Sequence, residues 1–163
     1  MPLSYGSRTV LGHTRWHPEI PAVAEVISGG SVRLECQGQQ GAREALLCGP
    51  VAVVGAEPGD VVVVDVLGVG RLDGVTVPEA HPGVIGCAPG SADPPVGSCA
   101  EARLGAGSRI VLPVRVRGAK LSAGDLHFGR GCTALDGWID LRVNLTKRGV
   151  ERFHVTGPLL MPV

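Results

Sequence analysis

The sequence predicts an all-β protein, a compact β-sandwich or barrel built from short strands and turns rich in glycine and proline. Three observations favour this fold class. Glycine (25 residues) and proline (13 residues) are abundant, and both are costly inside helices. Several short segments alternate apolar and polar residues, as half-buried strands do. No window longer than about ten residues repeats its apolar side chains with the period of a helix.

The expected strands follow one another along the chain. Residues 31–36 and 110–117 alternate, and residues 138–145 alternate most regularly. Residues 61–67 are almost continuously apolar, which is typical of a strand buried on both faces. The weaker strand candidates are residues 22–27, 51–54 and 151–155.

Two segments of the chain resemble each other. Residues 50–60 and residues 113–125 each consist of a short strand, a Gly-Ala turn and a Gly-Asp pair before the next strand. Glycine allows the positive φ that such turns need, and aspartate can bond its own backbone two residues on. The similarity between these two segments indicates an internal duplication. Residues 68–77 and 88–107 are expected to be loops, and residues 1–163 are expected to form one domain.

Composition and charge exclude several classes of protein. Lysine plus arginine (15) balances aspartate plus glutamate (15), and no basic run suggests nucleic-acid binding. No apolar stretch is long enough to cross a membrane. The first twelve residues lack the basic and apolar regions of a cleaved signal peptide, so we expect a cytoplasmic protein. Arginine far outnumbers lysine, a bias typical of high-GC bacterial genomes. The five cysteines contain no CxxC pair and are expected to be small buried residues.

Histidine residues are the first candidates for proton transfer or metal binding. His13 and His17 are four residues apart, a spacing that would place them on one face of a helix. Pro18 argues against that helix, and outside a helix this spacing does not bring the two side chains together. His81 precedes a short strand, and we interpret it as a turn-capping side chain.

A stronger candidate for metal binding or acid–base catalysis is the pair Asp125 and His127, which are two residues apart. In an extended segment their side chains lie on the same side of the chain. A carboxylate and an imidazole so placed could bind one metal ion or act as an acid–base pair. Arg130 and Trp138 follow shortly. The chain contains no Gly-x-Ser-x-Gly, no HExxH, and no glycine-rich loop before a helix.

Several segments of the chain resemble those of a known family, the acetamidase/formamidase family. The matching segments occur in the family's order and span nearly the whole chain. They are residues 15–21 (RWHPEIP), 32–36 (VRLEC), 49–60 (GPVAVVGAEPGD), 81–87 (HPGVIGC), 112–128 (LPVRVRGAKLSAGDLHF) and 137–141 (GWIDL). The resemblance implies a β-rich fold with sandwich and barrel elements. It also implies hydrolysis of small amides to ammonia and a carboxylate, assisted by a divalent cation that activates water.

The chain departs from the family in length and in its acidic residues. Family members are usually well over twice as long. Where the family carries a stretch rich in asparagine and aspartate, residues 37–48 have only Glu44 as an acidic residue. The family's Gly-Asp-x-His is followed by an acidic pair, but residues 128–132 (FGRGC) are not acidic. Hard divalent cations need several carboxylate ligands, so these losses weaken the case for a metal.

The leading hypothesis is therefore a repurposed enzyme of secondary-metabolite biosynthesis that cyclises, rearranges or eliminates an apolar small molecule without a metal cofactor. In it, Asp125 and His127 are the catalytic acid–base pair. The candidate substrate contacts are His13, His17, Arg130 and Trp138.

Two alternatives stay open. One is a hydrolase of small amides with a divalent metal ion, held by Asp125 and His127 with help from His13 and His17. The other is a non-catalytic subunit or ligand-binding module. The partner in the enzymatic hypotheses is a small molecule. Exposed strand edges would favour a homodimer. Cys99 and Cys132 fall where the family's active-site segments lie and are candidates for a reactive thiol.

Overall fold

The fold is an all-β arrangement of two sheets, as the sequence predicts. The computed structural model describes residues 17, 19–38, 47–89, 96–97 and 103–162. His13 and Cys99 lie outside these residues. Within the described part, the only helix is the five-residue α1 (Gly149–Phe153), and no helix is long and apolar enough to cross a membrane.

The first sheet is antiparallel and has β4 (Val61–Arg71) at its centre. On one side of β4 lies β9 (Gly137–Thr146), followed by the edge strand β2 (Gly30–Cys36). On the other side lies β6 (Arg109–Pro113), followed by the edge strand β10 (Leu159–Met161).

The second sheet carries β7 (Leu121–Phe128) between two neighbours. One neighbour is β5 (Ala80–Cys87). The other side of β7 pairs with β3 (Leu47–Val53) along its first half and with the short β8 (Thr133–Ala134) at its end. The strand β1 (Ala24–Val26) lies parallel to β3, whereas the other pairings are antiparallel.

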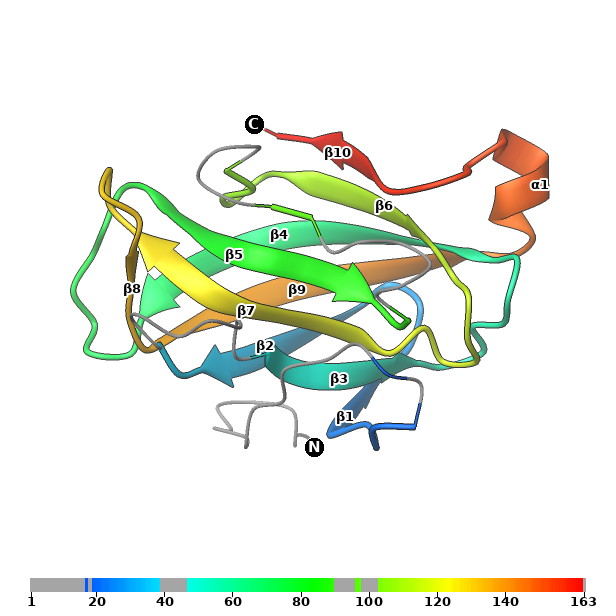
Figure 1. The fold of residues 1–163 in the computed structure, drawn as a ribbon, viewed down its shortest axis with the longest axis horizontal. Helices are drawn as coiled ribbons and strands as arrows, with labels where there is room; N and C mark the ends of the chain where they lie inside the picture. The colour runs from blue at the N-terminus through cyan, green and yellow to red at the C-terminus, as the bar shows by residue number, and fades with distance from the viewer. Residues whose placement is uncertain (1–16, 18, 39–46, 90–95, 98–102, 163) are drawn as a thin grey trace.

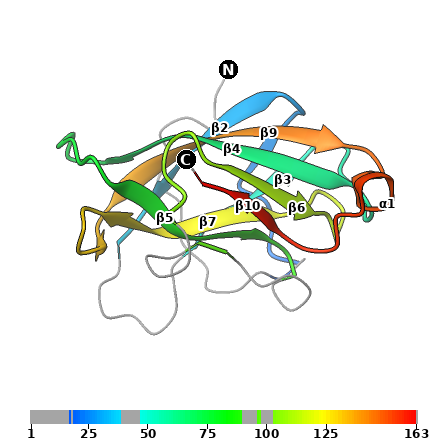
Figure 2. The same ribbon diagram turned by 90° about the horizontal axis from the view of Figure 1, so that it is seen from above.

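The core lies between the two sheets. Figure 1 shows β5 and β7 crossing in front of β4 and β9, and Figure 2 shows the two layers from the side. The inward side chains of both layers are apolar and fully buried, with Leu141 of β9 and Leu126 of β7 as examples. The strands β2 and β9 bury every second residue in this core, which is the physical basis of the alternation in their sequences.

The expected strands at residues 31–36, 61–67 and 138–145 are confirmed as β2, β4 and β9. The expected strand at residues 151–155 is wrong. After β9, Arg148 adopts a left-handed conformation (φ 55°) and Gly149 packs tightly against Val61. The chain turns there, and the next residues form α1. The expected strand at 110–117 ends early, at Pro113, because its pairing with β4 ends at that residue.

The two echoed segments lie against each other. Gly118 donates its N–H to the Ala56 carbonyl at 2.9 Å and accepts a bond from Val53 N–H at 2.8 Å. Val114 and Asp60 are joined in the same way, with the Val114 N–H bonded to the Asp60 carbonyl at 2.8 Å. The two turns therefore close the same end of the sandwich. Gly59 and Asp60 precede β4 as expected, but Gly124 and Asp125 lie inside β7, and the internal duplication stays a prediction.

The cysteines differ from the expectation of simple buried thiols. Cys36 at the end of β2 and Cys48 in β3 are both buried and form a disulfide, with Cα atoms 5.6 Å apart. This bond joins an edge strand of one sheet to a strand of the other. Cys87 is buried and forms no disulfide, as expected.

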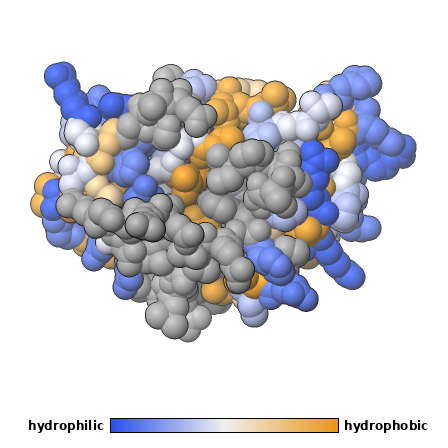
Figure 3. Space-filling view, in the orientation of Figure 1, coloured by the Kyte–Doolittle hydropathy of each residue, from blue (hydrophilic) through white to orange (hydrophobic). Residues whose placement is uncertain are grey.

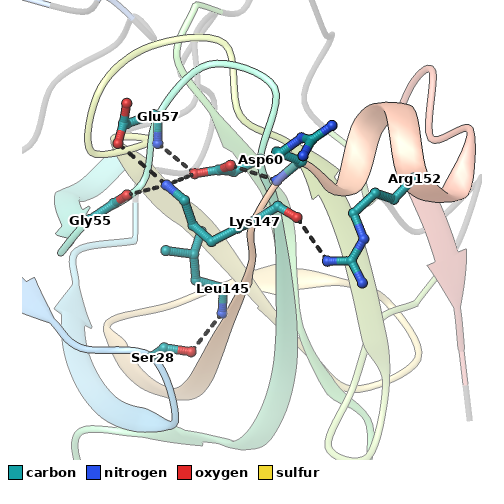
Figure 4. A network of polar contacts seen from close by, with 8 residues as sticks. Ser28, Gly55, Glu57, Asp60, Leu145, Lys147 and Arg152 are labelled. Atoms are coloured by element: carbon teal, nitrogen blue, oxygen red, sulfur yellow. Dashed lines mark hydrogen bonds and ion pairs between the residues drawn. The ribbon is translucent and has the colours of Figure 1, made fainter.

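A buried carboxylate organises the end of the sandwich beside α1. Asp60 is only 3% exposed. Its Oδ2 accepts bonds from Lys147 Nζ at 2.6 Å and from the Glu57 N–H at 2.9 Å, and its Oδ1 accepts the Arg148 N–H at 2.8 Å. Figure 4 shows these contacts converging on Asp60. The carboxylate thus connects the turn before β4 to the segment after β9.

This network predicts acid-sensitive stability. Burial alone raises the pKa of Asp60, but the hydrogen bonds from Lys147, Arg148 and Glu57 outweigh burial and lower the pKa below its ordinary value. The folded protein therefore takes up this proton at a lower pH than the unfolded chain does. The stabilisation is present above the unfolded pKa of about 3.9 and is lost as the pH falls through the lower folded value.

Urea unfolding of the wild type and of Asp60→Asn between about pH 6 and pH 3 checks this expectation. The difference in unfolding free energy between the two proteins should shrink toward the acid end. A difference that stays constant or grows there would show that the Asp60 carboxylate is not the group responsible.

The exposed edge of the first sheet is partly apolar. Leu159 and Met161 of β10 are about half exposed. Figure 3 shows hydrophobic atoms gathered in the upper middle of one face, with hydrophilic side chains at its two ends. The expectation of a homodimer stays a prediction.

Candidate functional site

Two histidines meet across the paired strands β5 and β7. His81 of β5 and His127 of β7 are register partners, and their rings lie edge to face with centroids 5.4 Å apart. Figure 1 shows these two strands side by side, with β8 next to the end of β7. The site is therefore built by strand pairing between segments that are more than forty residues apart in the sequence.

Asp125 and His127 form the pair that the sequence suggests. His127 Nε2 lies 3.0 Å from Asp125 Oδ2, and the two side chains are 16% and 28% exposed. Asp125 has φ 52°, so the strand is not regularly extended there. Gly83 of β5 lies next to it, and a Cβ at that position would come within 2.4 Å of the Asp125 carbonyl oxygen. The glycine makes room for this strained backbone, a kind of strain that often accompanies functional sites.

His81 is held in a defined tautomer. The ring is buried, with 1% exposure, and its Nδ1 lies 3.0 Å from the Pro82 carbonyl oxygen. Since a carbonyl only accepts, Nδ1 carries the proton and Nε2 of the neutral ring carries the lone pair. Burial lowers the pKa of His81, more than the bond to Pro82 raises it. The imidazole is therefore neutral at neutral pH, which is the state that can bind a metal ion.

Cys132 completes the cluster. Its Sγ lies 3.8 Å from His81 Nε2, and donor atoms of His81, His127 and Cys132 all lie within 4.8 Å of one another. Cys132 also has a positive φ, 53°. In the structure it is disulfide-bonded, and a disulfide sulfur is a far weaker ligand than a thiolate. The three residues are the only described group of this kind that could hold a metal ion.

A cavity of about 410 Å³ opens beside His81. Its wall includes the charged side chains of Glu79 and Arg103, whose Oε1 and NH1 atoms are 3.8 Å apart. The apolar part of the wall comes from Val69, Val77, Pro78, Ala80 and Ala106. A small polar molecule could thus approach the buried imidazole from a pocket that carries both charges.

The other predicted contacts lie outside the cluster of His81, His127 and Cys132, although Arg130 pairs with Glu79 in the cavity wall. Arg130 is 95% exposed, and its Nε lies 3.8 Å from Glu79 Oε2. His17 is exposed, and its Nδ1 accepts the Glu19 N–H at 3.2 Å. His13 cannot be placed, because it lies outside the described residues.

Trp138 lies on β9 rather than in the histidine cluster. Its ring covers Gly68 and Gly70, where a Cβ would come within 3.2 and 2.4 Å of ring atoms. The Arg33 guanidinium stacks 4.1 Å from the ring centroid. These contacts give Trp138 a packing role in the first sheet.

Sequence reasoning missed two members of the site. It treated His81 as a turn cap, although His81 lies inside β5 and faces His127. It also gave no role to Glu79. The pattern that could have revealed His81 is its pairing with the Asp-x-His strand, which requires knowledge of the neighbouring strand and its register.

The fold and the site define a class of protein: a two-sheet β protein with an imidazole–carboxylate pair and a second imidazole beside a small cavity. The sequence comparison is more specific. The model of the Acetamidase/Formamidase family matches residues 4–77 and 91–163. The chain belongs to this family.

The similar proteins are longer than this chain. It is 26% identical to a formamidase of Methylophilus methylotrophus, with 92% of this chain and 68% of the relative covered. It is 28% identical to an acetamidase of Mycolicibacterium smegmatis, with 98% and 72% covered. The first alignment extends over 275 positions, more than the 163 residues here, so gaps interrupt the similarity.

Solved structures share the fold. A gamma lactamase from Delftia acidovorans superimposes with a TM-score of 0.73 at 22% identity, covering 99% of this chain and 71% of that one. An acetamidase from Bacillus halodurans gives a TM-score of 0.66 at 20% identity, covering 84% and 69%.

These findings correct the leading hypothesis. The expectation of a metal-independent cyclase, isomerase or lyase of secondary metabolism is wrong, because the family match and the curated relatives support an acetamidase/formamidase-like enzyme. That hypothesis rested on the loss of acidic residues after His127. It overlooked that strand pairing brings His81 and Cys132 to the same place.

Proposed function

We propose that this chain hydrolyses small amides to ammonia and a carboxylate at the cavity beside His81. The observation that carries the proposal is the convergence of His81, His127 and Asp125 on adjoining strands of a chain that belongs to the acetamidase/formamidase family. The relatives' names, formamidase and acetamidase, support amides of one or two carbons as the first substrates to test.

The donor set fits a divalent metal ion when Cys132 is a thiol. His81, His127 and Cys132 would hold the ion, because their donor atoms already lie within 4.8 Å of one another. A bound divalent ion supplies Lewis-acid polarisation of the amide carbonyl and a lowered pKa of water. The sequence-based expectation of no metal cofactor rested on missing carboxylates, and two imidazoles with a thiol provide a different donor set.

Asp125 orients His127 and is our candidate for the proton acceptor. Its Oδ2 holds the Nε2–H of His127, which fixes the tautomer and leaves the lone pair on Nδ1. The Asp125 side chain is 28% exposed, so water can reach the carboxylate. In the reaction, one water molecule gives its proton to this base and its oxygen to the carbonyl carbon. The C–N bond then breaks, and the leaving nitrogen takes up a proton as ammonia.

The cavity wall provides contacts for a small uncharged substrate. Arg103 can donate hydrogen bonds and Glu79 can accept them, and both line the pocket with His81. An amide needs both kinds of contact, since its carbonyl accepts and its NH₂ group donates. We propose that these two side chains orient the amide, with the apolar wall around its alkyl group.

Ammonia release from formamide and acetamide tests the proposal. The reduced full-length chain, supplied in turn with zinc, cobalt, manganese and magnesium, is expected to release ammonia from at least one of the two amides. A γ-lactam belongs in the same panel, although ring opening releases an amino acid and must be followed by mass. A correctly folded, reduced protein that turns over none of these compounds with any of the metals would refute the proposal.

A further inference from the structure

The cluster of His81, His127 and Cys132 has a donor set that discriminates between metals and between oxidation states. We infer that it binds a borderline-soft divalent ion of the zinc class, in preference to magnesium or calcium, and only while Cys132 is a thiol. Metal loading and disulfide formation at Cys132 then exclude each other. This inference deepens the proposed function by naming the metal class and its control, although the binding itself does not require hydrolysis.

The donor atoms decide the metal class. Magnesium and calcium take oxygen ligands, whereas imidazole and thiolate suit zinc and its neighbours in the transition series. None of the three donors is an oxygen, and Asp125, the carboxylate next to them, is engaged with His127. Cys132 therefore decides which metal binds, because a soft thiolate takes the place of a carboxylate as the third donor.

The spacing of the donors also fits a zinc-class ion. Bonds of about 2.1 Å to nitrogen and about 2.3 Å to sulfur in tetrahedral geometry place a nitrogen and a sulfur ligand about 3.6 Å apart. Cys132 Sγ and His81 Nε2 are 3.8 Å apart. This pair needs only a small adjustment to reach ligand positions, and the His127 donor atom lies within 4.8 Å of both.

Both histidines have the outer contacts that metal-binding imidazoles use. His81 Nδ1 bonds to the Pro82 carbonyl, and His127 Nε2 bonds to the Asp125 carboxylate. A ligating histidine typically uses its second ring nitrogen in this way, which fixes the ring and the tautomer. The two rings are therefore oriented before any ion arrives.

The oxidation state of Cys132 controls its ability to bind. In the structure the residue is disulfide-bonded. Breaking that S–S bond takes two electrons and two protons and produces two thiols. A dithiol reductant supplies both and is itself oxidised to a disulfide. The Cys132 thiol then loses its proton to solvent as the metal–sulfur bond forms.

The test compares reduced and oxidised protein with cobalt as a spectroscopic probe. Reduced wild-type chain is expected to bind one Co²⁺ with a sulfur-to-cobalt charge-transfer band, and zinc should displace it whereas magnesium should not. The oxidised chain should show no such band. In Cys132→Ser the band should disappear, and zinc affinity should fall by roughly 100-fold or more, since losing even an outer-shell partner costs roughly 10–100-fold.

Cys87→Ala is the matched control, because Cys87 is a buried cysteine that forms no disulfide and lies outside the cluster. It should keep the band. A second measurement needs no variant: zinc should protect Cys132 of the reduced wild type from alkylation, as followed by peptide mass. A band of equal strength in Cys132→Ser or in oxidised protein would overturn the inference, as would unprotected Cys132 under saturating zinc.

The same samples separate this inference from the proposed function. Amide hydrolysis that proceeds equally in reduced wild type and Cys132→Ser would leave the proposed function standing and remove the role of Cys132. A cobalt–thiolate band without hydrolysis of any amide would support the metal site and count against the proposed reaction.

Discussion

Replacing His81 by glutamine is expected to lower kcat/KM for amide hydrolysis by about 100-fold or more, within the range that loss of an acid–base or metal-binding group produces. His81 is fully buried, faces His127 across the strand pair and forms part of the cavity wall. Glutamine keeps a polar side chain of similar length but has no imidazole nitrogen. Ammonia release from the better of formamide and acetamide measures the effect.

His154→Gln is the matched control for this variant. His154 is exposed at the end of α1, at the opposite end of the sandwich from β8. The same substitution there should leave kcat/KM unchanged. Equal activity of His81→Gln and wild type, in proteins with equal melting temperatures, would place the reaction elsewhere in the molecule.

Replacing Asp60 by asparagine is expected to lower the free energy of unfolding by about 2–3 kcal/mol at neutral pH. The buried carboxylate satisfies two backbone N–H groups and the Lys147 ammonium. An amide can accept on one atom only, and its NH₂ group meets donors instead of acceptors. Lys147 itself is half exposed and can regain water, which keeps the loss below that of a fully buried pair. Urea unfolding monitored by circular dichroism gives the difference.

Glu57→Gln tests whether charge alone accounts for that loss. Glu57 contacts the same Lys147 Nζ at 3.4 Å, but its side chain is 69% exposed. This variant should cost less than about 0.5 kcal/mol. If the two variants lose the same stability, the hydrogen bonds to the backbone are not what makes Asp60 important.

The confirmed strands are those whose burial leaves a regular pattern in the sequence. Residues 138–145 alternate because β9 buries one face against the core, and residues 61–67 are apolar because β4 is central. The strand β5 was predicted only as a short strand after His81, and β7 only as an extended segment around Asp125 and His127. Their sequences contain Pro82, Gly83 and Gly124, which break the alternation, and Gly83 is needed because the positive-φ backbone at Asp125 lies against it.

In the candidate site, too, the local contact was predictable from the sequence and the contacts between strands were not. The Asp125–His127 contact is local, so a two-residue spacing was enough to suggest it. Cys132 was recognised only as a thiol in an active-site segment. Its neighbours, His81 and His127, come from two strands whose pairing register no local pattern records.

The sequence by itself determined the all-β class, the principal strands and the family, because alternation and motif order are properties of neighbouring residues. The tertiary structure decided which side chains share a site. Contacts such as His81–His127 and His81–Cys132 depend on strand register, and a shift of one residue would turn each side chain to the opposite face of its sheet. Register is set by the packing of the whole core, so the chemistry of the site becomes visible only when both sheets are in place.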